Sequence, residues 1–185
     1  MTNASLNQDF AFPLSEFYAR AALPLPRLEI IPGEVMPEPY RSLLVHEREM
    51  TLTLERFHDS EIYIRAQGTE QRNGQYFREV VLHLAKGDVP VEFGANCVSL
   101  ASFPADARRM ILEEKIPLGR ILKDYSIPHT IRVPRFFRVE PDAFICGALH
   151  LASPVTLYGR QAVIFDSQQQ PLSQVVEILP PIPLH

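Results

Sequence analysis

Three strand-like runs follow one another between residues 61 and 100, and they constrain the fold more than any other part of the chain. Glu61–Ala66 alternates apolar and polar residues, and a polar turn at Thr69–Gly74 leads into the long run Tyr76–Leu84. Gly87-Asp88 is a hairpin signal, and Val89–Leu100 forms the third run. This spacing predicts an antiparallel meander rather than βαβ units.

The C-terminal half adds further strands. Thr130–Val139 predicts a strand that Pro134 breaks, which places it at an edge or a bulge. Val155–Phe165 and Leu172–Leu179 predict the last two strands. The chain holds 17 prolines, which argue against an all-helical architecture, and Pro24–Gly33 is predicted to be an extended connector.

Helices are predicted around the sheet. Pro104–Lys115 has the best pattern, with an acidic residue early and basic residues late. Met50–Phe57 fits both a strand and a helix, because its apolar residues match either spacing. Shorter helices are predicted at Pro13–Leu23, Pro37–His46 and, after a turn, Pro117–Leu122.

Taken together, these elements predict the α+β class. We expect a single domain over residues 1–185, with about six mostly antiparallel strands and helices gathered toward one face or end. Residues 1–12 are polar and weakly patterned, so we expect them to be frayed.

Composition limits the partners and the compartment. A net charge of −4 argues against a nucleic-acid or anionic-membrane binder. The sequence has no run of about 18 apolar residues and no signal-peptide pattern, so we expect a cytoplasmic protein without a membrane span. We further expect a monomer, with buried free thiols at Cys97 and Cys146, each inside a strand-like run.

Glu177 is an anomaly in the last strand-like run, Pro171–Pro180. It has apolar neighbours on both sides, and successive strand residues point to opposite faces, so both faces are predicted to be covered. A buried carboxylate needs a partner, or it becomes protonated. Glu177 is therefore either one half of a structural ion pair or a ligand-facing carboxylate in an apolar pocket.

Arg78 is a matching anomaly. Within Tyr76–Leu84 it is in phase with the more apolar face, whereas Glu79 lies on the more polar one. A buried guanidinium is costly unless it meets an anion, and it can hold a carboxylate through two parallel hydrogen bonds. Either Arg78 pairs with Glu177, or it holds a ligand carboxylate while Glu177 faces the other end of the ligand.

Common catalytic signatures are missing. His46-Glu47 begins like a zinc-protease motif, but the second histidine is absent, and the other histidines lack ligand spacing, so we predict no metal site. The sequence has no phosphate-binding glycine loop and no Gly-x-Ser-x-Gly elbow. Gly159, inside a strand-like run, marks either a bulge or backbone that makes room for a ligand.

Five short motifs, in order, resemble the chorismate pyruvate-lyase family, including its shorter, divergent branch. The resemblance runs from about Tyr40 to Pro180. The motifs are Leu43-Leu44 with Met50-Thr51, then Phe77-Arg78-Glu79-Val80-Val81-Leu82, Pro117-Leu118-Gly119-Arg120-Ile121-Leu122, Leu157-Tyr158-Gly159-Arg160, and Pro171-Leu172 with Val176-Glu177-Ile178-Leu179-Pro180. The sequence departs from the family at 93–97, where better-studied members carry Ala/Gly-Arg-Thr.

The resemblance implies a six-stranded antiparallel sheet with an internal ligand site that helical flaps cover. It implies a carbon–oxygen lyase that converts chorismate to pyruvate and 4-hydroxybenzoate, a quinone precursor, without a metal or organic cofactor. By resemblance, Arg78 binds the aromatic carboxylate, Glu177 meets the ring hydroxyl, Leu118 contributes backbone and Met50 lies on the flap side. It also favours the helical interpretation of Met50–Phe57.

Two routes fit such an elimination. Glu177 acts as a general base toward C4–H, or orients the hydroxyl, while a nearby donor helps the enolate depart. Alternatively, hydrogen passes within the substrate and the protein selects the reactive conformer. The rival function is a non-catalytic sensor of an aromatic acid, since effector-binding domains of some transcription regulators share this fold. Such domains usually follow a helix-turn-helix, and we expect the roughly 35 residues before the sheet to be too few for one.

Overall fold

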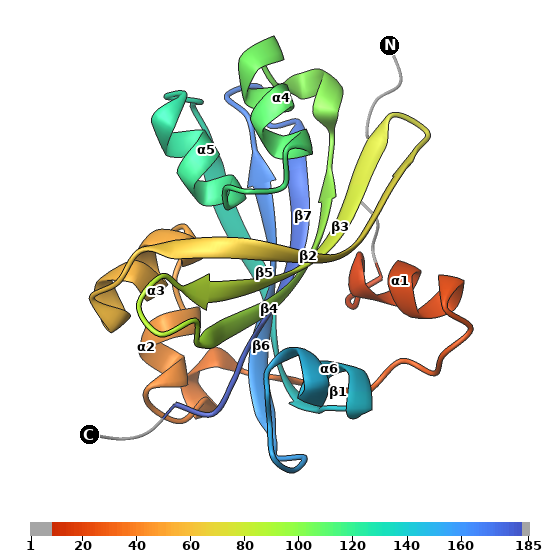
Figure 1. Cartoon of the computed structure of the whole chain (residues 1–185), viewed down its shortest axis with the longest axis vertical. Helices are drawn as coiled ribbons and strands as arrows, with labels where there is room; N and C mark the ends of the chain where they lie inside the picture. The colour runs from red at the N-terminus through yellow and green to blue at the C-terminus, as the bar shows by residue number, and fades with distance from the viewer. Residues whose placement is uncertain (1–8, 183–185) are drawn as a thin grey trace.

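A computed structural model describes residues 9–182, and its centre is one seven-stranded antiparallel sheet (Figure 1). The strands lie in the order β1-β5-β6-β7-β4-β3-β2 across the sheet. Their bounds are β1 Arg27–Ile31, β2 Ile62–Arg72, β3 Gln75–Leu84, β4 Pro90–Val98, β5 Thr130–Glu140, β6 Leu157–Phe165 and β7 Pro171–Leu179. The expected α+β class with an antiparallel sheet is confirmed, with seven strands in place of about six.

Within the described residues, six α-helices and two short 3-10 helices surround the sheet. The α-helices are α1 Leu14–Arg20, α2 Tyr40–Leu44, α3 Met50–His58, α4 Ala105–Leu112, α5 Leu118–Asp124 and α6 Ala143–Ala148, and the 3-10 helices are η1 Gly33–Val35 and η2 Leu100–Ser102. The ambiguous segment after residue 49 is thus a helix, in which Met50 and Leu54 are buried one turn apart.

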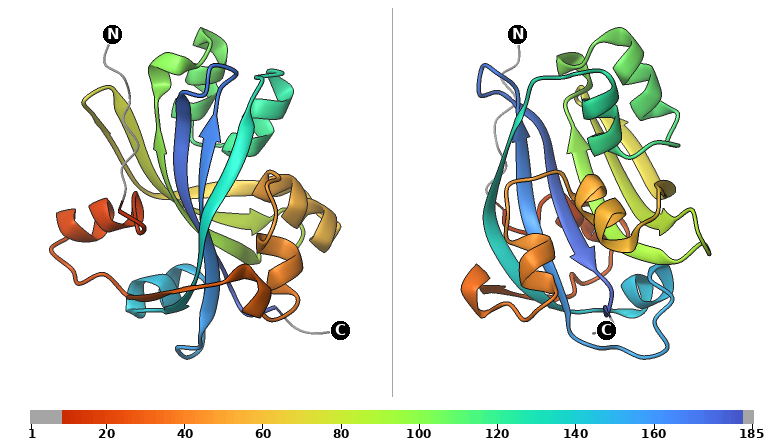
Figure 2. Two further views of the ribbon diagram at one scale, coloured as in Figure 1. Left: turned by 180° about the vertical axis from the view of Figure 1, so that it is seen from behind. Right: turned by 90° about the vertical axis from the view of Figure 1, so that its left-hand side faces the viewer.

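The predicted meander is β2-β3-β4, and β7 pairs with β4 to join it to the C-terminal strands. β2 continues to Arg72, so only Asn73-Gly74 remains of the longer polar turn predicted there. The pairing of β5 with β6 shifts between Arg132 and Arg135, which is the irregularity predicted at Pro134. The seventh strand, β1, comes from the expected connector and pairs with β5 at the edge. Figure 2 shows how strongly the sheet twists.

Apolar residues cover both faces of the sheet. One face packs against α1 and α6 in a cluster that includes Phe77, Phe93 and Ile178. The other face carries two clusters, one under α4 and α5 that includes Ile121 and Val175, and one under α2 and α3. The helices therefore lie on both faces, and the face of β3 that holds Glu79, predicted to be the more polar one, is buried as well.

Two local expectations differ from the structure. Cys146 lies in helix α6 and not in a strand, because Asp142 caps the helix by accepting a hydrogen bond from the Ile145 N–H at 2.9 Å. The expectation of a frayed N-terminus falls outside the described residues for 1–8. Ala11 and Phe12, in contrast, are buried, and Phe12 packs in the cluster under α1.

Candidate functional site

Two rows of directly paired residues cross the middle of the sheet and bring the sequence anomalies to one face. Successive strand residues alternate between faces, so paired residues and those two positions away share a face. The first row, from β3 to β6, is Arg78, Asn96, Val175 and Ala162. The second row, along the same strands, is Val80, Gly94, Glu177 and Arg160.

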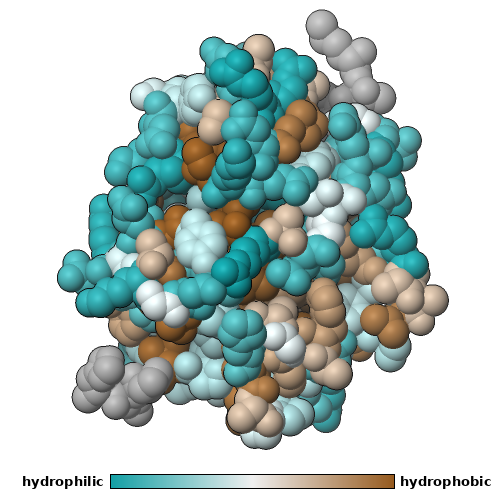
Figure 3. All heavy atoms as spheres, in the orientation of Figure 1, coloured by the Kyte–Doolittle hydropathy of each residue, from teal (hydrophilic) through white to brown (hydrophobic). Residues whose placement is uncertain are grey.

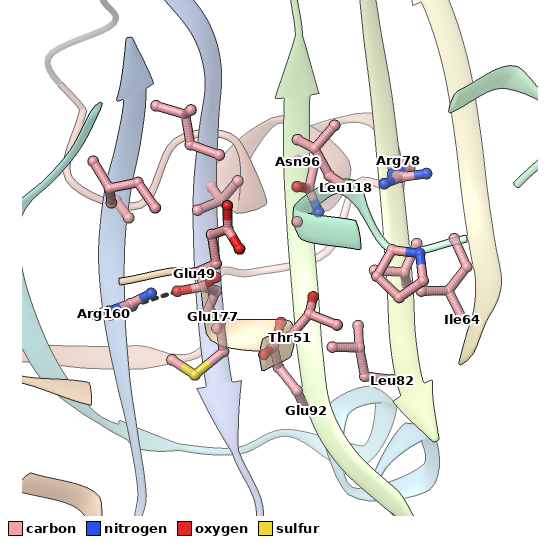
Figure 4. A pocket seen from close by; sticks show the side chains of 18 residues that line it. Glu49, Thr51, Ile64, Arg78, Leu82, Glu92, Asn96, Leu118, Arg160 and Glu177 are labelled. Carbon is pink, nitrogen blue, oxygen red and sulfur yellow. Dashed lines mark hydrogen bonds and ion pairs between the residues drawn. The ribbon is translucent and has the colours of Figure 1, made fainter. Parts of the chain in front are cut away.

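The polar members of these rows line a cavity between the two apolar clusters of this face. The N-terminal residues of α3 and α5 cover it, namely Met50 and Thr51 from α3 and Leu118 and Gly119 from α5. Figure 4 shows Arg160 and Glu177 on one side and Arg78 on the other, with Asn96, Thr51 and Glu92 between them. The sheet thus supplies the charged groups, and the helices close the space above them.

Arg78 is the unusual cation of this cavity, because it is only 1% exposed and forms no ion pair with any residue that the structure describes. Within residues 9–182, its Nε and Nη1 atoms have no hydrogen-bond partner. Burial lowers the pKa of the guanidinium from its usual value, and the charge of Glu114 opposes that shift. Glu114 accepts a hydrogen bond from Tyr76 and forms no ion pair with Arg78 in the described structure. A buried, unpaired guanidinium is a strong site for an anion.

Glu177 has a partner other than the one considered from the sequence. Its Oε2 atom lies 2.5 Å from Nε of Arg160 on the neighbouring strand, and its side chain is 13% exposed. An internal arginine therefore neutralises Glu177, and that arginine is not Arg78. The carboxylate nevertheless lines the cavity. Glu177 is thus a member of an ion pair and a cavity residue at the same time.

Arg160 also fixes the chain that leads into α3. Its guanidinium donates to the carbonyl oxygens of Leu44, His46 and Arg48 at 3.2, 2.8 and 3.0 Å. It also lies 3.2 Å from Nδ1 of His46. Burial, with the charges of Arg160 and Arg48, lowers the pKa of His46 to about 4, so this imidazole is neutral at pH 7 and accepts that hydrogen bond.

Glu92 is a second carboxyl group in the cavity. It is 4% exposed, and among the residues that the structure describes its Oε2 atom has no hydrogen-bond partner. Burial raises the pKa of Glu92 well above its usual value, and the charge of Glu177 adds to the effect whereas Arg160 opposes it. The surroundings of Glu92 therefore favour the neutral form of its carboxyl group.

Close contacts hold the two covering helices together. A Cβ on Gly119 would lie 3.3 Å from Oγ1 of Thr51, so glycine allows α5 to approach α3 closely. Arg120 and Glu55 form an ion pair at 2.6 Å between the same helices. His129, just before β5, pairs at 2.9 Å with Glu49, which also lines the cavity.

All four residues that the sequence singled out for the site line this cavity, namely Met50, Arg78, Leu118 and Glu177. Gly159 fits neither interpretation proposed for it. It pairs in register with Phe137 and Ile178, and a Cβ there would lie 2.6 Å from the Phe137 ring and 2.5 Å from the Glu177 carbonyl oxygen. This glycine makes room for a core side chain on the face opposite the cavity.

The sequence argument missed Glu92, Asn96 and the clamp made by Arg160. A signal for Glu92 was present, since it sits between Val91 and Phe93 as Glu177 sits between apolar neighbours. Within residues 9–182, no three or more His, Cys, Asp or Glu side chains come together in a way that could hold a metal ion. No helix in the same range is both long and apolar enough to span a membrane.

Comparison with solved structures shows that the chain shares its fold with the effector domain of a bacterial protein. The effector domain of PhnF from Mycobacterium smegmatis matches with a TM-score of 0.55 over 74% of this chain and 90% of that domain, at 11% identity. The PhnF structure matches with a TM-score of 0.54 over 73% of this chain and 64% of that chain, at 11% identity. The chain therefore spans somewhat less than two thirds of that longer PhnF chain.

A third solved structure, the gene product SA0254 from Staphylococcus aureus subsp. aureus N315, matches with a TM-score of 0.52 at 6% identity, over 74% of this chain and 90% of that one. No family model and no curated protein matches the sequence. At these identities the likenesses establish the fold, and the ligand must be argued from the residues in the cavity.

Proposed function

We propose that this chain binds a small cyclic carboxylic acid in the cavity, with Arg78 as the anchor of the carboxylate. The observation that carries the proposal is the buried guanidinium, which has no counter-ion in the part of the chain that the structure describes. Such a group gains about 1.5–3 kcal/mol from a charge-assisted hydrogen bond. The strand residues Val80, Ile164 and Val175 give the cavity an apolar lining that suits a ring.

The specific activity that we propose is chorismate pyruvate-lyase. The order of motifs in the sequence supports it, and so does the placement of charge. Arg78 and Glu177 are separated by two strands and two residues, roughly 12 Å between Cα atoms. Their extended side chains and one six-membered ring between them would fill that span. The ring carboxylate would lie at Arg78, and the hydroxyl-bearing end would lie at Glu177.

In this reaction the C3–O bond to the enolpyruvyl group breaks, a proton leaves C4 and the ring becomes aromatic. Glu177, at the far end of the cavity from Arg78, is the residue suited to the proton that leaves C4. Glu177 forms an ion pair with Arg160, and its carboxylate can serve there as a hydrogen-bond acceptor or as a general base. The N-terminal residues of α3 and α5 cover the cavity, an arrangement that limits the access of water to a reacting group.

The alternative function is recognition of such an acid without turnover. The observation that favours it is the fold, which the chain shares with the effector domain of PhnF. Arg160 binds both Glu177 and the segment before α3. A ligand that contacts Glu177 would therefore also influence the position of the helix that covers the cavity. A sensor needs a link of this kind between its ligand and a movable element.

Incubation with chorismate separates the two functions. The lyase produces 4-hydroxybenzoate and pyruvate in equal amounts, which chromatography and a pyruvate assay detect. A sensor binds chorismate or 4-hydroxybenzoate and leaves it unchanged. If calorimetry detects binding of neither acid, the shared proposal of a carboxylate anchored at Arg78 is wrong.

The anchor is tested directly by Arg78→Met, which removes the charge and keeps much of the volume. We expect the Kd for 4-hydroxybenzoate to rise at least about tenfold, because a charge-assisted hydrogen bond is lost. Arg138→Met is the matched control, since Arg138 lies on β5, is exposed and pairs with Glu29 outside the cavity. An unchanged Kd in a folded Arg78→Met protein would exclude Arg78 from the site.

A further inference from the structure

The carboxyl group of Glu92 has no role in the binding scheme described above, although it lies inside the same cavity. Burying an ionisable group without a partner costs free energy, so its presence needs an explanation. Neither packing nor an ion pair supplies one. Within the described part of the chain, Glu92 forms no ion pair and its Oε2 atom has no hydrogen-bond partner.

The strand register places Glu92 beside Glu177. Glu92, Gly94 and Asn96 share the cavity face of β4, and Gly94 pairs directly with Glu177. Gly94 has no side chain, and the Glu92 carboxyl leans over it, since a Cβ there would lie 3.2 Å from Oε1 of Glu92. Glu92 and Glu177 therefore lie near one another on neighbouring strands, and both lie below Arg78 in the view of Figure 4.

The two carboxyl groups differ in their surroundings. Glu177 forms an ion pair with Arg160 at 2.5 Å, whereas Glu92 is buried without an ion-pair partner among the described residues, and burial with the nearby charge of Glu177 raises its pKa. The charged or titratable groups that face the pair from the neighbouring elements are Arg78 on β3, Arg160 on β6, Glu49 at the start of α3 and neutral His46. One base and one acid side by side are the arrangement that proton-transfer enzymes commonly use.

We propose that Glu92 is the proton donor of this site and acts together with Glu177 in the elimination. The C3–O bond breaks, and its electron pair goes to the departing oxygen, which takes the proton of Glu92 and leaves as the enol of pyruvate. The C4–H electrons complete the aromatic ring, and that proton passes to the Glu177 carboxylate. A proton then returns from Glu177 to Glu92, the enol tautomerises to pyruvate, and no proton is gained or lost overall.

This inference rests on the proposed lyase function, and its first test does not depend on turnover. The infrared difference spectrum between wild type and Glu92→Gln at pH 7 should contain the carbonyl stretch of a protonated carboxyl group. Glu92→Gln should also leave the free energy of unfolding nearly unchanged, since a neutral amide replaces a neutral acid of the same shape. Carboxylate bands in the difference spectrum would overturn the inference while leaving the anchor at Arg78 intact.

The second test measures catalysis. Glu92→Gln should lower kcat with chorismate by about 100-fold or more, the usual contribution of a general acid, and should change the Kd for 4-hydroxybenzoate only a few fold. Glu79→Gln is the matched control, because Glu79 is also a buried carboxyl of the sheet but lies on the opposite face, and it should keep wild-type kcat. Wild-type kcat in Glu92→Gln would refute the role of Glu92 and leave the lyase function standing. An inactive wild type that still binds 4-hydroxybenzoate would instead refute the lyase function, and the proton transfer with it.

Discussion

At the scale of single residues, two buried arginines of this protein have opposite roles. Both are 1% exposed and both point to the same face of the sheet. Arg160 is fully engaged, with Glu177 and three backbone carbonyl oxygens as acceptors. Arg78 has no counter-ion in the described residues and is left for a ligand. The same residue type is thus a structural clamp on one strand and a proposed binding group three strands away.

This contrast predicts opposite effects on stability. Arg78→Met should raise the free energy of unfolding of the ligand-free protein by about 1 kcal/mol or more, because an uncompensated buried charge is removed. Arg160→Met should lower it by about 3–5 kcal/mol, because Glu177 is left buried without its partner. Urea unfolding of both variants without ligand measures the difference. A destabilised Arg78→Met protein would mean that Arg78 has a structural partner after all.

The sequence predicted the faces of side chains better than their partners. Strand alternation correctly placed Arg78 and Glu177 toward one covered face, since it depends only on the local period of two. It did not reveal that Glu177 pairs with Arg160, because pairing depends on how β6 and β7 align, which is a long-range property. The same local argument applied to Glu92 would have found a third buried ionisable side chain.

At the scale of elements, α3 is one of the two helices that cover the cavity. Its sequence fitted a strand and a helix equally well, and burial of Met50 and Leu54 against the sheet favours the helix. Its N-cap residue, Glu49, pairs with His129, and this pair lies between the cavity and a second surface depression that also includes Glu49 and Ile131. In Figure 3, hydrophobic residues are exposed between polar ones in the left half of the view, where Figure 1 shows α3 with α5 above it.

The His129–Glu49 pair makes a pH-dependent contribution to stability. The hydrogen bond to Glu49 raises the pKa of His129 above 6.5, although burial opposes it. The stability that the pair contributes is therefore fully present below pH 6.5 and is lost as the pH rises through the raised pKa. The difference in free energy of unfolding between wild type and His129→Gln should shrink as the pH rises. A difference that is constant from acid to alkaline pH would show that the charge of His129 contributes nothing.

At the scale of the whole molecule, the cavity divides the core. Two apolar clusters lie on the cavity face, one under α4 and α5 and the other under α2 and α3, and the polar rows lie between them. The third cluster, under α1 and α6, is on the opposite face of the sheet and does not line the cavity. A ligand would therefore connect two halves of one face and leave the other face untouched.

Hydrogen exchange can detect this division. Saturating 4-hydroxybenzoate should slow the exchange of amide hydrogens in both α3 and α5, because each helix must move for the cavity to open. The exchange of amides in α1 and α6 should stay the same, which serves as an internal control. Equal slowing in all four helices would indicate a global gain in stability, and slowing in α1 alone would place the ligand on the wrong face.

The strand register links correct folding to an assembled site. Gly94, Glu177 and Arg160 meet because β4, β7 and β6 align in one register, and that same register turns Phe93, Val176 and Ile178 into the core of the opposite face. A slip of one residue in β7 would turn Glu177 into that core and expose Val176 to the charged cavity. Such a slip would therefore destabilise the fold at the same time as it dismantles the site. The stability of the fold and the assembly of the site depend on the same strand register.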